Sequence, residues 1–126
     1  MTTKKILCID DDEAILALYR AIFKNYENIE MLEATDGMKG FTLARDRTPD
    51  LIIIDNKMPN LPGEQTAKLF RGLPATRHLP IIMVTAMKLS PVEARLIKLD
   101  VNEIITKPFK HEELIKTVEE YLGPIT

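Results

Sequence analysis

The sequence contains a single cysteine, no tryptophan and no long hydrophobic run. Cys8 can form no disulfide within the chain, which fits a reducing compartment, and we interpret it as a small core residue. No apolar run approaches the about 20 residues that a membrane-spanning helix requires. The first residues, Met1 to Lys5, lead into only four apolar residues before three aspartates, which excludes a signal peptide. These absences predict a cytoplasmic protein without a membrane segment.

Neither sign of charge dominates the sequence. There are 17 Lys and Arg residues against 19 Asp and Glu residues, and no basic block or aromatic-basic stripe is present. Direct nucleic-acid binding by this domain is therefore not expected. A chain of 126 residues is long enough to bury a normal core. Because no linker, internal repeat or low-complexity tract interrupts it, we predict a single domain over residues 1–126.

Short apolar segments alternate with segments of helical periodicity along the chain. The apolar segments, predicted to be β-strands, cover residues 6–9, 28–34, 51–54, 81–84 and 101–106. The predicted helices cover residues 13–24, 38–46, 64–73, a segment that begins at Pro91, and residues 110–122. Asp12 and Ser90 are candidate N-caps. This alternation predicts an α/β fold with a doubly wound, five-stranded parallel sheet of the flavodoxin-like (βα)5 type, in strand order 2-1-3-4-5.

The segment that ends at Asp55 is predicted to be the central strand of the sheet. Leu51 to Ile54 is an unbroken apolar run, which is typical of a parallel strand buried on both faces. Asp55 follows directly, and Pro59 prevents the strand from continuing. In open α/β sheets, ligands bind at the carboxyl ends of the strands. Asp55 is therefore a candidate functional residue.

Polar residues also follow three other predicted strands. Asp10 and Asp11 come after the first strand, Thr85 after the fourth and Lys107 after the fifth. Singly, each has a structural explanation as a turn, cap or loop residue, but their joint placement at one sheet edge favours a site. Three converging carboxylates repel one another, so that one must hold its proton more tightly or a hard cation such as Mg²⁺ must bind. Carboxylate nucleophile, metal, lysine and hydroxyl together indicate phosphoryl transfer.

These motifs resemble the receiver domain of bacterial two-component response regulators over essentially the whole chain. The matching residues are Ile9-Asp10-Asp11, Pro49-Asp50-Leu51 through Asp55 to Met58-Pro59 and Gly63, Val84-Thr85-Ala86, and Lys107-Pro108-Phe109. The resemblance implies that Asp55 accepts a phosphoryl group from the phosphohistidine of a sensor histidine kinase or phosphotransfer protein, or from a small acyl phosphate. It implies a phosphoacceptor switch with slow self-dephosphorylation, and not an enzyme in the ordinary sense.

The resemblance also implies the roles of individual residues. Mg²⁺ would be held by Asp10, Asp11, Asp55 and the backbone carbonyl of Lys57. Thr85 would bind a phosphoryl oxygen, Lys107 would pair with the phosphoryl group, and the Lys107–Pro108 peptide would be cis. The fourth helix, fifth strand and fifth helix would form an output face for a downstream protein or effector domain, or for a homodimer formed on phosphorylation.

The chain departs from the family pattern at the position three before Lys107. This switch position is usually aromatic in the family, and here it is Ile104. Lys57 and Met87 flank the predicted site, and we hypothesise that they modulate hydrolysis by controlling access of the attacking water.

Three other functions compete with the switch. A phosphohydrolase of the haloacid-dehalogenase type needs a second aspartate two residues after the nucleophile, where this chain has Lys57. A flavin or dinucleotide carrier needs a first loop rich in glycine or hydroxyl groups, and Asp10-Asp11-Asp12 would repel its phosphate. The main alternative is a degenerate receiver that acts as a phosphorylation-independent interaction module.

Overall fold

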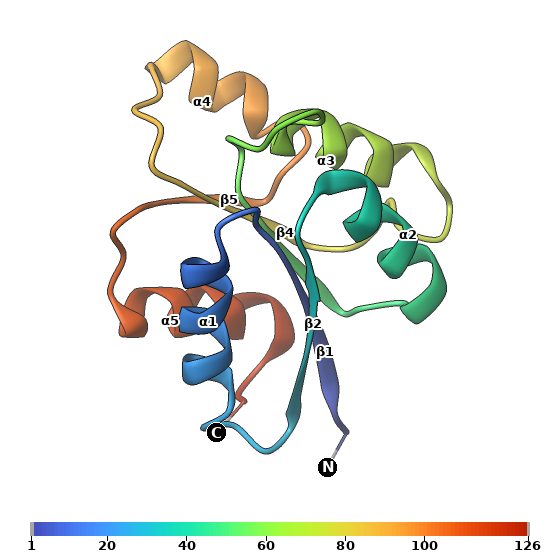
Figure 1. The fold of residues 1–126 in the computed structure, drawn as a ribbon, viewed down its shortest axis with the longest axis vertical. Helices are drawn as coiled ribbons and strands as arrows, with labels where there is room; N and C mark the ends of the chain where they lie inside the picture. Colours follow the sequence, from blue (N-terminus) through green and yellow to red (C-terminus); the bar gives the residue numbers. More distant parts are fainter. Residues whose placement is uncertain (1, 126) are drawn as a thin grey trace.

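The structure is a computed structural model and describes residues 2–125. Five strands and five helices alternate along the chain (Figure 1). In order they are β1 (Lys4–Ile9), α1 (Glu13–Phe23), β2 (Ile29–Ala34), α2 (Gly37–Arg47), β3 (Leu51–Ile54), α3 (Gly63–Gly72), β4 (Ile81–Thr85), α4 (Pro91–Ile97), β5 (Glu103–Thr106) and α5 (His111–Leu122). None of these helices is long and apolar enough to cross a bilayer.

The strands form one parallel sheet in the order β2-β1-β3-β4-β5, which confirms the predicted fold class and strand order. Ile9 of β1 is paired with Ile54 of β3, and Thr85 of β4 is paired with Thr106 of β5. The residues that follow these positions therefore leave the sheet at the same edge, its carboxyl edge.

Helices cover both faces of the sheet. Leu51 and Ile53 of β3 pack in a cluster with α1 and α5, whereas Ile52 and Ile54 pack in a second cluster with α2, α3 and α4. Both faces of β3 are thus buried, which explains why its sequence is continuously apolar. Cys8 is fully buried in the first cluster, as predicted. In the same cluster the ring of Tyr19 lies 6.1 Å from the ring of Phe109, in a stacked arrangement.

Three of the helices, α1, α2 and α4, begin with side-chain caps. Asp12 accepts a hydrogen bond from the backbone N–H of Ala14, and Asp36 from that of Lys39. Ser90 and Glu93 form a reciprocal capping box, with Pro91 as the first residue of α4. The N-caps predicted at Asp12 and Ser90 are confirmed. Helix α2 begins at Gly37, one residue earlier than predicted, because Asp36 is its cap.

The opposite, amino edge of β4 and β5 is held together by one arginine from α3. The guanidinium of Arg71 donates hydrogen bonds to the carbonyls of Asp100, Arg77 and Leu79 at 2.9, 2.9 and 2.6 Å, and to the Asn102 side chain at 3.0 Å. Asn102 Oδ1 also accepts from the backbone N–H of Ile81. We call this set of contacts the Arg71 clamp. Asn102, which was predicted to be strand, belongs to this clamp, and the N–H of Val101, also predicted to be strand, donates to the carbonyl of Ile97. Strand β5 therefore begins at Glu103.

Candidate functional site

Strands β1 and β3 place two carboxylates side by side at the carboxyl edge of the sheet. The backbone N–H of Asp10 donates to the carbonyl of Ala34 at 3.1 Å, and that of Asp55 donates to the carbonyl of Ile9 at 3.1 Å. These bonds extend the ladder by one residue beyond each strand end. Asp10 and Asp55 therefore start from neighbouring, rigid backbone positions, as the order of the strands predicts.

Asp10, Asp11 and Asp55 form one acidic cluster. Each offers a carboxylate oxygen, and these oxygens lie within 4.8 Å of one another. Asp10 and Asp55 are buried, with 1% and 8% of their surface exposed, whereas Asp11 is exposed. Asp10 Oδ1 accepts a hydrogen bond of 2.9 Å from the backbone N–H of Asp12. The cluster thus has two ordered ligands and one that faces solvent.

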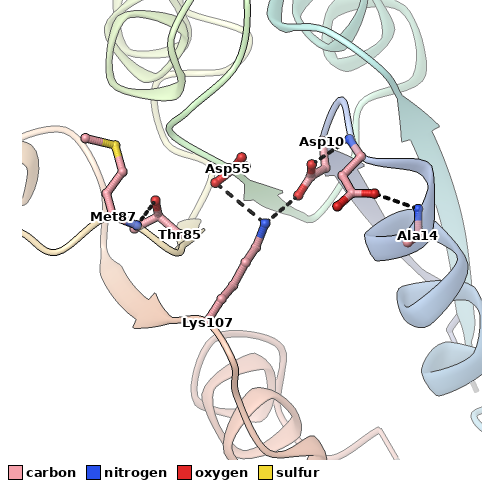
Figure 2. A network of polar contacts seen from close by, with 7 residues as sticks. Asp10, Ala14, Asp55, Thr85, Met87 and Lys107 are labelled. Atoms are coloured by element: carbon pink, nitrogen blue, oxygen red, sulfur yellow. Dashed lines mark hydrogen bonds and ion pairs between the residues drawn. The ribbon is translucent and has the colours of Figure 1, made fainter.

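Lys107 supplies a positive charge to this acidic cluster (Figure 2). Its ammonium lies 3.0 Å from Asp10 Oδ2 and 3.7 Å from Asp55 Oδ1, between the two carboxylates. The backbone N–H of Lys107 donates to the carbonyl of Thr85 at 2.9 Å, which fixes the residue to the end of β4. The Lys107–Pro108 peptide is cis, which confirms the expectation from the family resemblance.

The pKa of the Asp55 carboxyl reflects its burial and the charges around it. Burial raises the pKa of its carboxyl above the ordinary 3.8, the ammonium of Lys107 lowers it, and the negative charge of Asp10 raises it. Hydrogen bonds from the backbone N–H groups of Lys57 and Asn56 also lower this pKa, and the net direction is upward. Burial is the largest cause of the upward direction, and repulsion from Asp10 is a smaller one that the ammonium of Lys107 opposes.

Thr85 lies on the other side of Asp55 from Asp10 (Figure 2). It is fully buried, and its hydroxyl oxygen accepts a hydrogen bond of 3.1 Å from the backbone N–H of Met87. The hydroxyl proton of Thr85 is a donor that this contact does not use.

The two predicted modulating residues, Lys57 and Met87, and the switch position Ile104 lie around the site in different ways. Lys57 is exposed and contributes its backbone N–H to Asp55. Met87 is 36% exposed. Ile104 is half-buried beside Met83 in the sheet and lines a groove with Met87. Met58, which is near Asp55 in sequence, is instead a buried core residue.

Asn56 is a site residue that the sequence reasoning missed. It is 4% exposed, and its side-chain oxygen accepts a 2.8 Å hydrogen bond from the backbone N–H of Glu64 at the start of α3. Its side-chain nitrogen contacts Met87 Sδ at 3.4 Å. The sequence held no signal for Asn56, because its burial and its partners depend on how the loops after β3 and β4 come together.

Gly63 allows the loop after β3 to approach α3 closely. Its N–H donates to the carbonyl of Asn56 at 2.9 Å. A Cβ atom at this position would lie 2.2 Å from the carbonyl oxygen of Asp55 and 2.9 Å from Asn56 Cα. Only glycine fits this contact, and the contact holds the backbone that carries Asp55.

The donor set of the acidic cluster fits a hard divalent cation. All three ligand groups are carboxylates, and Mg²⁺ favours a few carboxylates together with water and phosphate oxygens. Three carboxylates face the single ammonium of Lys107, so the cluster has formal negative charge in excess, which a cation would relieve.

The sheet order and the acidic cluster at its carboxyl edge define an α/β protein of the flavodoxin-like class. The sequence pattern of the response regulator receiver domain matches residues 6–119. The chain therefore belongs to the response regulator receiver domain family, which confirms the resemblance and its place in two-component signalling. A receiver domain is a signalling switch rather than an ordinary enzyme.

Similar proteins are spread over several bacteria. The polar-differentiation response regulator DivK of Brucella ovis is 30% identical over 121 residues, which cover 96% of this chain and 98% of DivK. The chemotaxis protein CheY4 of Vibrio cholerae is 27% identical, with a TM-score of 0.86 over 95% of this chain and 99% of CheY4. The receiver domain of the sensor histidine kinase PA1611 from Pseudomonas aeruginosa shares the fold, with 24% identity and a TM-score of 0.86 over 98% of this chain and 100% of that domain. That structure has a magnesium ion coordinated in its active-site cleft.

Proposed function

We propose that this protein is a phosphoacceptor switch in which Asp55 takes a phosphoryl group from the phosphohistidine of a sensor histidine kinase or phosphotransfer protein. The observation that carries this proposal is the convergence of Asp55, Asp10 and Asp11 within 4.8 Å, with Lys107 between the two buried carboxylates. This arrangement supplies a nucleophile, a place for a cation and a fixed positive charge. The proposed setting is the cytoplasm, where such kinases present their phosphohistidine.

In the transfer, an Asp55 oxygen forms a bond to phosphorus as the bond from phosphorus to the donor's imidazole nitrogen breaks. Mg²⁺, held by Asp10, Asp11, Asp55 and the Lys57 carbonyl, would neutralise charge on the phosphoryl oxygens. Lys107 then exchanges part of its contact with Asp55 for the phosphoryl group, to which it is already close. Thr85 donates its unused hydroxyl proton to another phosphoryl oxygen. The new group brings about −1.5 to −2 charges to a buried position, which is enough to reorganise the loops around it.

The proposed output face consists of α4, β5 and α5. Val92, Leu96 and Leu99 are 60%, 58% and 76% exposed, and their spacing places them along one side of α4 and the turn after it. Exposed apolar side chains at helical spacing support contact with a downstream protein, an effector domain or a second copy of the chain.

A phosphorylation-independent interaction module is the second candidate function. The same exposed stripe on α4 is present without any phosphoryl group, and Ile104 stands at the position where the family resemblance implies an aromatic switch residue. On this alternative, the output face binds its partner constitutively.

Lys57 and Met87 form part of the same proposal as modulators of hydrolysis. The ammonium of Lys57 is exposed, and Met87 borders the site from the loop after β4. If Lys57→Ala and Met87→Ala both leave the dephosphorylation rate of Asp55 unchanged, this role is wrong.

The test of the switch is the mass of the intact protein after incubation with acetyl phosphate, with and without Mg²⁺. We expect one phosphoryl adduct that requires Mg²⁺ and is lost in Asp55→Asn. Asp46→Asn, which changes an exposed aspartate on α2, is the matched control and keeps the adduct. No adduct in the wild type, with acetyl phosphate or with a phosphohistidine donor, would favour the interaction module.

A further inference from the structure

Met87 makes two polar contacts that join the loops on either side of the site. Its backbone N–H donates to the hydroxyl oxygen of Thr85 at 3.1 Å, and its sulfur accepts from the side-chain nitrogen of Asn56 at 3.4 Å. Asn56 follows Asp55 directly in the loop after β3, while Met87 lies in the loop between β4 and α4. The two contacts therefore connect the residue beside Asp55 to the hydroxyl of Thr85.

Asn56 is a fixed end of this connection. Its side-chain oxygen is held by Glu64 N–H at the start of α3, and its carbonyl accepts from Gly63 at 2.9 Å and Met58 at 3.1 Å. Gly63 also packs closely against this backbone, since a Cβ atom added to it would lie 2.9 Å from Asn56 Cα. The Asn56 amide therefore offers its nitrogen to Met87 from a rigid position.

Met87 is the movable end. It is 36% exposed, unlike Met58 and Met83, which are buried in the core. A groove of about 530 Å³ lies beside it, lined in part by Ala86, Leu89, Ala94 and Ile104. The space is ample for one methionine side chain, so Met87 has an apolar surface to occupy when it leaves Asn56.

We propose that Asn56 and Met87 form a latch that holds the β4–α4 loop and Thr85 in the unphosphorylated arrangement and so sets how readily the site accepts a phosphoryl group. This inference rests on the proposed phosphoacceptor function. When Thr85 moves toward a phosphoryl group, the hydrogen bond from the Met87 N–H to its hydroxyl carries Met87 with it, and the sulfur then separates from Asn56. Met87 is thus a positioning residue that acts through Thr85.

The chemistry of the thioether explains why the latch is weak. Sulfur is a poor hydrogen-bond acceptor, so the contact biases the loop without locking it. If the competent arrangement of Thr85 is populated in only a fraction of molecules, the apparent affinity for a phosphoryl group falls by that fraction. A side chain without an acceptor should raise the fraction, and one with a stronger acceptor should lower it.

The test measures Mg²⁺-dependent binding of beryllofluoride, a phosphoryl analogue that cannot be hydrolysed, by titration calorimetry. Met87→Leu keeps the size of the side chain and removes the acceptor, and we expect binding about threefold tighter. Met87→Gln replaces sulfur by an amide oxygen, and we expect binding to weaken by about tenfold. Met38→Leu, which changes an exposed methionine on α2, is the control and should match the wild type.

The direction of the two shifts separates the latch from the other roles of Met87. A residue that only packs would weaken binding in both variants and lower thermal stability, and this result would overturn the proposal. Equal affinity in both variants and the wild type would also overturn it, even if dephosphorylation rates change, because Met87 would then act on water alone. Failure of the wild type to bind beryllofluoride at any Mg²⁺ concentration would refute the phosphoacceptor function itself, and the latch with it.

Discussion

The two ends of the sheet use buried charge in opposite ways. At the amino edge, the guanidinium of Arg71 donates four hydrogen bonds to three backbone carbonyls and one amide. Burial lowers the pKa of Arg71, and the nearby Asp100 offsets part of this effect. At the carboxyl edge, Lys107 faces two buried carboxylates, one at 3.0 Å and one at 3.7 Å, with Asp11 close by. The first edge is fully satisfied, and the second retains uncompensated negative charge.

This difference explains how one small domain can be both stable and responsive. The Arg71 clamp joins α3 to the loops before β4 and β5, so the parts that it holds gain nothing by moving. The carboxyl edge gains free energy when a cation or phosphoryl group rebalances its charge, and the loops there are connected by weaker contacts. Removing charge should therefore destabilise the protein at one edge and stabilise it at the other.

Arg71→Ala should give the largest loss of stability. The change leaves the carbonyls of Asp100 and Leu79 without their donor, and we expect the free energy of unfolding to fall by about 3 kcal/mol in urea titrations. Arg77→Ala removes an exposed arginine in the neighbouring loop and should change stability by less than about 0.5 kcal/mol. Phosphorylation of Asp55 should persist in folded Arg71→Ala. Equal losses in the two variants would remove the contrast between the edges.

Asp55→Asn should have the opposite sign in the absence of Mg²⁺. Because the pKa of Asp55 is raised above 3.8, the folded protein binds this proton more tightly than the unfolded chain does. This tighter proton binding stabilises the folded protein fully below pH 3.8, and the stabilisation is lost as the pH rises through the raised pKa of Asp55. Asp55→Asn avoids this loss, so it should be more stable than the wild type at pH 7, with a difference that shrinks toward pH 4 in chemical denaturation with EDTA.

Mg²⁺ should reverse that order. A cation that binds only the folded protein stabilises it by about 2.7 kcal/mol when its concentration is one hundred times the dissociation constant. We expect this gain in the wild type and in Asp46→Asn, and little of it in Asp55→Asn, by thermal unfolding with increasing Mg²⁺. The same Mg²⁺ dependence in Asp55→Asn would show that Asp55 is not a ligand.

Gly63→Ala should disturb the carboxyl edge through the backbone. The added methyl group would meet the carbonyl of Asp55 at 2.2 Å, and relief of that clash should cost about 2 kcal/mol and slow phosphorylation. Gly72, on the same helix, has no atom within 4 Å of an added Cβ. Gly72→Ala should therefore stabilise the protein by up to about 1 kcal/mol. Identical effects at the two glycines would contradict the close contact at Gly63.

Ser90→Ala should have the smallest of these effects. It removes the capping box of the seven-residue helix α4, at an expected cost of about 1 kcal/mol. Ser90→Asp, which retains an acceptor for the N–H of Glu93, should recover most of this loss. Hydrogen exchange of the amides in α4 is the appropriate measurement, since a loss confined to this helix distinguishes capping from a global effect.

The sequence predicted the features that depend on backbone order. Apolar runs located all five strands, and the residue directly after a run located Asp10, Asp55 and Lys107, because parallel strands bring their carboxyl ends to one edge. The start of β1 at Lys4 was missed, because pairing of Lys4 with Ile29 extends the strand beyond its apolar part.

Contacts made by long side chains were not predictable in the same way. Nothing in the pattern around Arg71 distinguishes it from an exposed arginine, and its role depends on where the loops before β4 and β5 meet α3. Met87 was placed near the site by its distance from Thr85, but its partner Asn56 became evident only when the two loops were brought together. Tertiary packing, and not local propensity, decides such contacts.

The aromatic pair Tyr19 and Phe109 gives the molecule an optical reporter. The chain has no tryptophan, and Tyr19 is 1% exposed with its ring stacked on that of Phe109, two residues after Lys107. Any rearrangement that carries Lys107 with it changes the asymmetric surroundings of this tyrosine. The near-ultraviolet circular dichroism of the unlabelled protein should therefore follow occupation of the site.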